Sequence, residues 1–178
     1  MRTFLAIPLP ADVRDGLADL AGEIGGLRAQ EPDTIHLTVR FLGEIDNSDE
    51  IVAAVRPVVA SHDPFSFGLR GLGGFPRKQR ATVLWVGIED HGLQAGSLAA
   101  GVDQALAGVG IERDRRPWHG HVTLGRFRAP KKLSRQLLAR SADFGEIAVD
   151  RLNLYRSVLS PQGARHEVVS ELSLGTGM

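Results

Sequence analysis

A single α+β domain over residues 1–178, with mostly antiparallel strands, is the fold class that the sequence predicts. Three observations lead to it. Helical and strand patterns are mixed along the chain, and several predicted strands follow one another directly. The 178 residues, 43% of them hydrophobic, suffice for one sizeable core, and no linker divides them. A short histidine-containing pattern recurs about half a chain apart, which favours two similar lobes.

Periodicity and turn-forming residues define the expected elements. Apolar residues at helical spacing predict helices over residues 10–27, 48–60, 92–109 and 131–140, with Ser48 as the N-cap of the second. Alternating or β-branched runs predict strands over residues 2–8, 34–42, 65–72, 81–88, 120–127, 144–149, 151–157 and 166–174. The glycine-rich stretch 71–80 and the segment 160–163 are expected to form turns.

The recurring pattern is histidine-x-threonine-apolar, and its copies are residues 36–39 and 121–124. Each copy follows a helix and a loop and lies in a predicted strand. Two lobes related by a pseudo-two-fold axis would place the copies face to face across a central cleft. Because side chains alternate along a strand, we expect one face of the first copy to be buried and the other to line that cleft. The buried set is Ile35, Leu37, Val39 and Phe41, and the cleft set is His36, Thr38 and Arg40.

A facing pair of histidines suits the cleavage of a phosphodiester. One imidazole can take a proton from the attacking oxygen while the other protonates the leaving oxygen, since the unperturbed pKa of histidine is about 6.5. The hydroxyls of Thr38 and Thr123 can donate hydrogen bonds to phosphate oxygens. Each copy offers one good metal ligand, without a cysteine or an acid beside it, so we expect a metal-free site with no cofactor. The alternative for either copy alone is a histidine that serves only packing.

Charge and composition restrict the function classes further. The net charge is zero, yet residues 113–135 carry eight basic side chains against one acid, and residues 64–88 carry four against none. This asymmetry predicts a positive face beside the second copy, although an ordinary solvated surface has the same composition. Cysteine is absent, which excludes disulfides and thiolate metal sites. We expect a cytoplasmic protein, since neither a signal peptide nor an apolar run of membrane-spanning length is evident.

At these residues the sequence resembles the two-histidine phosphoesterase superfamily. Within it, the chain looks most like the RNA 2′,3′-cyclic phosphodiesterases, historically called 2′-5′ RNA ligases. The resemblance spans nearly the whole chain in the expected order, and the first pattern with its Phe-Leu-Gly-Glu continuation is its most specific part. The segments that carry it are residues 2–10, 36–44, 83–87, 121–126, 152–157 and 161–163.

The resemblance implies a bilobal fold in which two antiparallel sheets line the cleft and helices lie outside. It implies hydrolysis of a terminal 2′,3′-cyclic phosphate on RNA to a 2′-phosphate. His36 would be the proton donor to the departing 3′ oxygen and His121 the proton acceptor from water. Thr38 and Thr123 would hold the phosphate, and Arg126 would bind substrate. A 2′-5′ ligation would be the reverse process, with a 5′-hydroxyl in place of water.

The sequence departs from the family pattern at three positions. Gly120 stands where the family usually has a proline, so the loop 117–120 is expected to be looser. His166 stands where the family often has an aromatic residue. Simple alternation places Arg126 on the face opposite His121, unless a bulge at Gly125 turns it back. His119 could share the face of His121.

Two other functions remain open from the residues. One is a module that binds RNA ends without turnover, for which basic segments and two threonines suffice. The other is a phosphodiesterase that acts on a small cyclic nucleotide or on a cyclic phosphate of ADP-ribose. The expected partner is RNA with a 2′,3′-cyclic phosphate end. No protein partner and no membrane are implied, and a monomer is expected.

Overall fold

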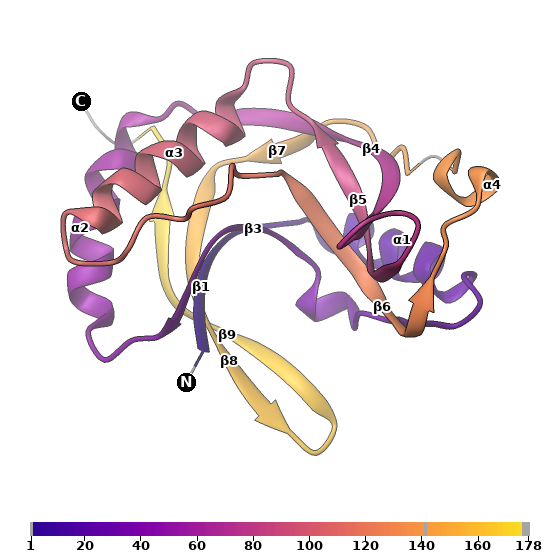
Figure 1. The fold of residues 1–178 in the computed structure, drawn as a ribbon. Coiled ribbons are helices and arrows are strands. Elements are labelled where there is room, and N and C mark those ends of the chain that lie inside the picture. Colours follow the sequence, from indigo (N-terminus) through magenta and orange to yellow (C-terminus); the bar gives the residue numbers. More distant parts are fainter. Residues whose placement is uncertain (1, 141, 176–178) are drawn as a thin grey trace.

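The computed structural model describes residues 2–140 and 142–175 (Figure 1). Its helices are α1 (Ala11–Gly22), α2 (Ser48–Ser61), α3 (Gln94–Ala107), α4 (Arg135–Leu138) and the short 3-10 turn η1 (Pro32–Thr34). Its strands are β1 (Arg2–Pro8), β2 (Leu27–Ala29), β3 (His36–Glu44), β4 (Phe65–Phe75), β5 (Ala81–Glu89), β6 (His121–Lys131), β7 (Ile147–Val149), β8 (Arg151–Ser160) and β9 (Gly163–Ser173). The expected α+β class is confirmed.

The strands form one curled sheet in the order β7-β4-β5-β6-β3-β1-β8-β9, with β2 paired to β6. All these pairings are antiparallel. The two halves of the sheet meet at β3 and β6, where Leu37 pairs with Val122. The two expected sheets are therefore the two halves of one sheet, joined at the strands that carry the repeated pattern.

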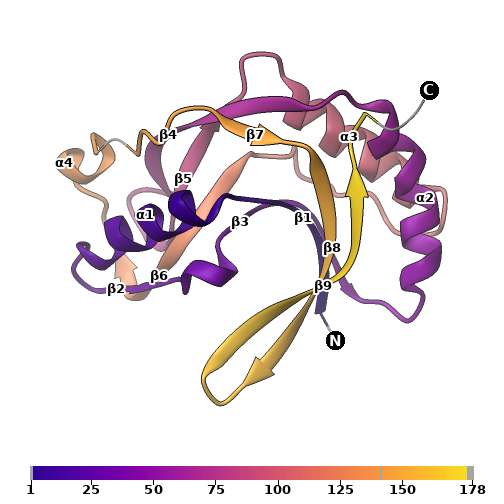
Figure 2. The same ribbon diagram turned by 180° about the vertical axis from the view of Figure 1, so that it is seen from behind.

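Helices cover the outside of each half. Helices α2 and α3 pack on each other and on β3, β8 and β9 (Figure 1). Helix α1 contacts β2 and β6, and α4 contacts β4, on the opposite half (Figure 2). The hairpin of β8 and β9 extends away from the body of the protein, as both views show. This arrangement leaves the inner side of the curled sheet uncovered by helices.

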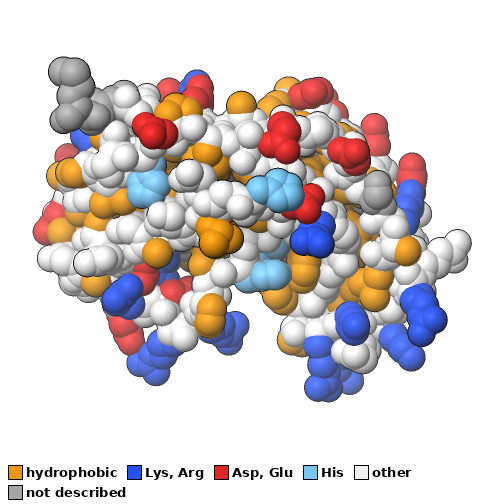
Figure 3. All heavy atoms as spheres, turned by 90° about the horizontal axis from the view of Figure 1, so that it is seen from above, with side chains coloured by type: hydrophobic (Ala, Val, Ile, Leu, Met, Phe, Trp, Pro, Cys, Tyr) orange, Lys and Arg blue, Asp and Glu red, His pale blue; other side chains and the backbone are white. Residues whose placement is uncertain are grey.

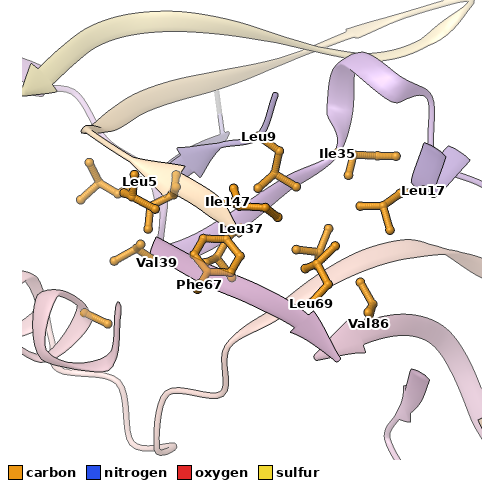
Figure 4. Close-up of a cluster of buried hydrophobic side chains, with 14 of the residues drawn as sticks. Leu5, Leu9, Leu17, Ile35, Leu37, Val39, Phe67, Leu69, Val86 and Ile147 are labelled. Atoms are coloured by element: carbon orange, nitrogen blue, oxygen red, sulfur yellow. The ribbon is translucent and has the colours of Figure 1, made fainter. Parts of the chain in front are cut away.

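The core lies on the sheet face that the helices cover. Leu37 and Val122, which join the two halves, are fully buried. Figure 4 shows Leu37 near Phe67 and Ile147, which belong to paired positions of β4 and β7. Burial of such side chains stabilises the fold by roughly 1.5–3 kcal/mol each, so the seam between the halves is firmly packed.

Several element boundaries differ from the sequence-based expectation. The first helix ends at Gly22, and Leu27–Ala29 forms the strand β2 instead of a last helical turn. Gly26 has a φ of +78°, a conformation that glycine adopts without strain and that a helix does not continue. Strand β4 continues through much of the expected turn, to Phe75. Asn47 caps α2 in place of Ser48, because its side chain accepts a hydrogen bond from the amide of Glu50 at 3.3 Å.

Candidate active site

Each strand that carries the repeated pattern has a bulge at the pattern's fourth residue. On β3, Thr38 lies opposite Ala6 and Arg40 lies opposite Leu5, which makes Val39 the extra residue. On β6, Thr123 lies opposite Trp85 and Gly125 lies opposite Leu84, which makes Leu124 the extra residue. A bulge reverses the alternation of the side chains that follow it. The half-chain repeat therefore includes a shared irregularity of the backbone as well as shared residues.

The bulges decide which later side chains reach the cleft. Phe41 and Arg126, each five residues after its histidine, both line the cleft. Phe41 is 69% exposed, so its expected place in the core is wrong. Arg40, expected in the cleft, instead forms ion pairs with Asp103 at 3.3 Å and with Asp114 at 3.2 Å. Arg126 shares the cleft with His121, because a bulge re-aims it as expected, although that bulge is at Leu124 and not at Gly125.

Gly125 is required by the approach of β2. A Cβ atom at this position would lie 2.5 Å from the carbonyl oxygen of Arg28 and 2.9 Å from Cγ of Leu27. Any larger residue would push β2 away from β6. The glycine thus permits the pairing that places Arg28 directly opposite Arg126.

The register between β3 and β6 brings the two copies of the pattern together. Because Leu37 lies opposite Val122 in an antiparallel pair, His36 takes the position opposite Thr123, and Thr38 the position opposite His121. All four polar side chains line one cleft of about 820 Å³. The structure therefore brings together every site residue that the sequence predicted: His36, Thr38, His121, Thr123 and Arg126.

His36 lies in a largely aromatic environment. Its ring stacks on Phe4 at 4.7 Å between centroids, and its Nε2 is 2.9 Å from Oγ1 of Thr38. The ring of His166 lies at a steep angle to it, with 5.3 Å between the ring centroids. Burial lowers the pKa of His36 to about 4, aided by repulsion from His166 and opposed by a hydrogen bond with the backbone of Thr34. His36 is consequently neutral at pH 7 in the free protein.

His121 has a defined tautomer. Its Nδ1 is 2.7 Å from the carbonyl oxygen of His119, and since a carbonyl can only accept, Nδ1 carries the proton. Nε2 is then unprotonated in the neutral ring and remains available to a substrate. Burial lowers the pKa of His121, partly offset by the hydrogen bond with His119. His119 thus contacts His121 through its carbonyl group and through its ring, which stacks on the His121 ring at 5.8 Å between centroids and also contacts Trp85.

The loop before the second histidine is tightly held. Trp118 donates a hydrogen bond from Nε1 to the carbonyl oxygen of Thr38 at 3.2 Å, which ties the loop to the first copy of the pattern. A Cβ atom on Gly120 would lie 2.5 Å from Cδ1 of Ile88. Ile88 fills the space beside Gly120, which leaves no room there for the side chain of a larger residue. Trp118 carried no recognisable signal in the sequence.

The tip of the β8–β9 hairpin completes the cleft. Gln162, Gly163, Ala164 and His166 line it on the side of β9. Nδ1 of His166 is buried and has no hydrogen-bond partner in the described part of the chain. Within residues 2–140 and 142–175 there is no group of three or more side chains that could hold a metal ion. In the same residues no helix has the length and apolar character needed to cross a membrane.

Comparison with known proteins identifies the family. The model of the 2′-5′ RNA ligase superfamily matches residues 11–160. An RNA 2′,3′-cyclic phosphodiesterase of Methanocaldococcus jannaschii is 30% identical over 96% of this chain and 99% of its own. One of Thermus thermophilus is 32% identical over 98% of this chain and 90% of its own.

Solved structures agree with this assignment. The protein TT0787 of Thermus thermophilus superposes with a TM-score of 0.77, at 31% identity over the full length of both chains. E. coli LigT complexed with 3′-AMP gives a TM-score of 0.79, at 26% identity over 97% of both chains. The resemblance drawn from the repeated pattern is confirmed: the chain belongs to the 2′-5′ RNA ligase superfamily.

Proposed function

We propose that this protein hydrolyses the terminal 2′,3′-cyclic phosphate of RNA to a 2′-phosphate, by acid–base catalysis that requires no metal ion. The observation that carries the proposal is the register of the two patterns, which sets both histidines and both threonines in one cleft. The curated relatives, named RNA 2′,3′-cyclic phosphodiesterases, support the substrate class. A strained cyclic phosphate is a good electrophile, so an acid and a base suffice.

His121 has the properties of the proton acceptor. Its lowered pKa keeps the ring neutral near pH 7, and its Nδ1 is already engaged by His119. The lone pair on Nε2 can take a proton from the water that attacks phosphorus. The bond from that water oxygen to phosphorus forms as the bond to the 3′ oxygen breaks.

His36 is the proposed proton donor to the 3′ oxygen. A pKa of about 4 in the free protein means that the ring must gain a proton as the substrate binds. An anionic phosphate a few ångströms away raises the pKa of a histidine, because it favours the charged ring. Substrate binding thus promotes the protonation state that donation requires. In the resulting imidazolium, Nε2 is a donor beside Oγ1 of Thr38.

Thr38, Thr123 and Arg126 are the proposed phosphate-binding and substrate-binding groups. The two threonines lie on opposite strands of the seam, each opposite the other copy's histidine. Their hydroxyls can donate to the two non-bridging oxygens of one phosphate, where negative charge builds up during the reaction. Arg126 adds a fixed positive charge on the same wall of the cleft. With a 5′-hydroxyl in place of the attacking water, the same groups would open the cyclic phosphate and form a 2′-5′ phosphodiester, as the bond to the 3′ oxygen breaks.

The test is an incubation with an RNA oligomer that ends in a 2′,3′-cyclic phosphate, in the presence of EDTA, with the position of the product phosphate mapped. We expect complete conversion to the 2′-phosphate at an unchanged rate. A 3′-phosphate product would mean that the 2′ oxygen is the leaving group, which would overturn the roles assigned to the two histidines. Loss of activity in EDTA, restored by a metal ion, would contradict the metal-free mechanism. Tight binding with no product over hours would favour a binding module instead.

A further inference from the structure

Two arginines of the cleft lining occupy opposite positions on the paired strands β2 and β6. Arg28 on β2 lies directly opposite Arg126 on β6, and both line the cleft. Opposite residues in an antiparallel pair have Cα atoms about 5 Å apart, and like charges at such positions destabilise the pair. In the described part of the chain, the ion pairs include neither arginine. This cross-strand pair costs stability unless an anion lies between the guanidinium groups.

Some other arginines have an acidic partner. Arg40, Arg113, Arg151 and Arg156 each form an ion pair with an aspartate or a glutamate. The acids on the cleft wall are Glu31 and Glu44, and the pKa of Glu44 is lowered by the chain's amino terminus and by Arg2, at the other side of the cleft. Glu31 takes part in no ion pair in the described part of the chain, so the charge of Arg28 and Arg126 is available to a ligand.

The chemistry of the substrate indicates which anion this is, on the basis of the proposed function. A terminal 2′,3′-cyclic phosphate occupies both ribose hydroxyls, so the RNA strand continues only through the 5′ oxygen. Any second phosphate of the substrate lies on that side. We propose that Arg28 and Arg126 form a subsite for the phosphodiester immediately 5′ of the terminal nucleotide, which makes the protein selective for substrates with a phosphate at that position, such as RNA strands, over nucleotides with a 5′-hydroxyl. Arg28 is the specificity-determining residue of this subsite.

A basic surface continues from the subsite. Beyond Arg126 the exposed cations Arg128 and Lys132 follow on β6 and just past it, and Arg77, Lys78 and Arg80 lie at the turn between β4 and β5. In the described residues these five side chains take part in no ion pair. Figure 3 shows Lys and Arg gathered at its lower right, on the side where Figure 1 places α4 and the end of β6. Upstream phosphates of an RNA strand would meet this surface after the subsite.

The experiment compares three substrates that share one terminal nucleotide. They are a nucleoside 2′,3′-cyclic phosphate with a 5′-hydroxyl, the same molecule with a 5′-phosphate, and a short RNA oligomer. KM and kcat are measured for the wild type, for Arg28→Gln and for the control Arg56→Gln, an exposed arginine on α2 in the other half. Loss of one charge-assisted contact should raise KM about ten-fold for the two substrates with a second phosphate, with kcat unchanged.

For the 5′-hydroxyl nucleotide, KM should change less than about two-fold in either variant, since it carries no second phosphate. For the oligomer, the slope of log KM against the logarithm of the salt concentration should be smaller by about 0.7 in Arg28→Gln, as expected for the loss of one phosphate contact with a single strand. An equal rise in KM for all three substrates would assign Arg28 to the reacting phosphate and overturn the proposal. KM values of Arg28→Gln that equal those of Arg56→Gln for all three substrates would also overturn the proposal.

A binding measurement separates this proposal from the proposed function. Fluorescence anisotropy with a 2′-phosphate-ended oligomer reports binding without turnover. Arg28→Gln should bind this oligomer about ten-fold more weakly than the wild type, while Arg56→Gln should bind it as the wild type does. Equal binding by all three proteins would overturn the subsite even if hydrolysis is normal. Absence of hydrolysis with the expected binding pattern would overturn the proposed function and leave the subsite supported.

Discussion

Acidification tests the environment of His36, because its pKa is linked to folding. The pKa is about 4 in the folded protein and 6.5 in the reference state, so the unfolded chain binds more protons between these values. The contribution of His36 to the unfolding free energy is therefore fully present above pH 6.5 and is lost as the pH falls toward 4. Integrating the two titrations from pH 7 to pH 5 gives a loss of about 2 kcal/mol, an upper bound for a side chain that keeps some exposure.

The assay is urea denaturation of the wild type and of His36→Gln at pH 7 and pH 5. The variant retains a polar side chain that does not titrate, so acid-sensitive groups elsewhere cancel in the comparison. We expect the wild type to lose more unfolding free energy than the variant does, by up to about 2 kcal/mol. An identical loss in both proteins would refute the conclusion that burial and His166 depress this pKa.

Three further substitutions test the walls of the site. Gly125→Ala should lower the unfolding free energy by about 1–3 kcal/mol, because the new Cβ would lie 2.5 Å from the carbonyl oxygen of Arg28; urea denaturation measures this. Trp118→Phe removes the hydrogen bond to the Thr38 carbonyl, and should lower stability by about 1 kcal/mol and lower kcat more than it changes KM. His166→Phe removes the repulsion from His166 while keeping a ring, so the pKa of His36 should rise, as an NMR titration of its ring protons would show.

Each of these has a contradicting result. An unfolding free energy of Gly125→Ala equal to that of the wild type would mean that β2 can shift away from β6 without loss of stability. An unchanged kcat in Trp118→Phe would show that the bond to β3 does not position the loop. An unchanged or lower pKa of His36 in His166→Phe would show that His166 does not contribute to lowering the pKa of His36.

The sequence could predict which polar side chains line the cleft, because the signal for them is local. A histidine and a threonine two residues apart in a strand share a face, whatever the rest of the fold does. Two copies at half-chain separation then predicted that both patterns line one cleft, but the copies lie side by side on the paired strands β3 and β6 and do not face each other across it. The antiparallel α+β class followed for a similar reason, since consecutive strand patterns indicate hairpins.

The features that sequence reasoning missed depend on pairing between distant segments. Bulges at Val39 and Leu124 are visible only in the register with β1 and β5. The bulge at Val39 exchanged the expected places of Arg40 and Phe41, and the bulge at Leu124 turned Arg126 into the cleft. Strand β2 is three residues long and follows glycines, so its pattern is too short to identify. Arg28 therefore carried no signal until its partner on β6 was known. Gly120 looked permissive because Ile88, which fills the space beside it, is far away in the sequence.

The central claim is that His36 and His121 act together on one phosphate. The most direct measurement is the single-turnover rate of hydrolysis of a 2′,3′-cyclic phosphate RNA oligomer by His36→Ala, by His121→Ala and by the double variant. The control is His91→Ala, whose side chain is 75% exposed beside Glu89. Each single variant should be slower by at least ~10²-fold, the double variant should be little slower than either, and the control should match the wild type. A wild-type rate in either single variant would contradict the account.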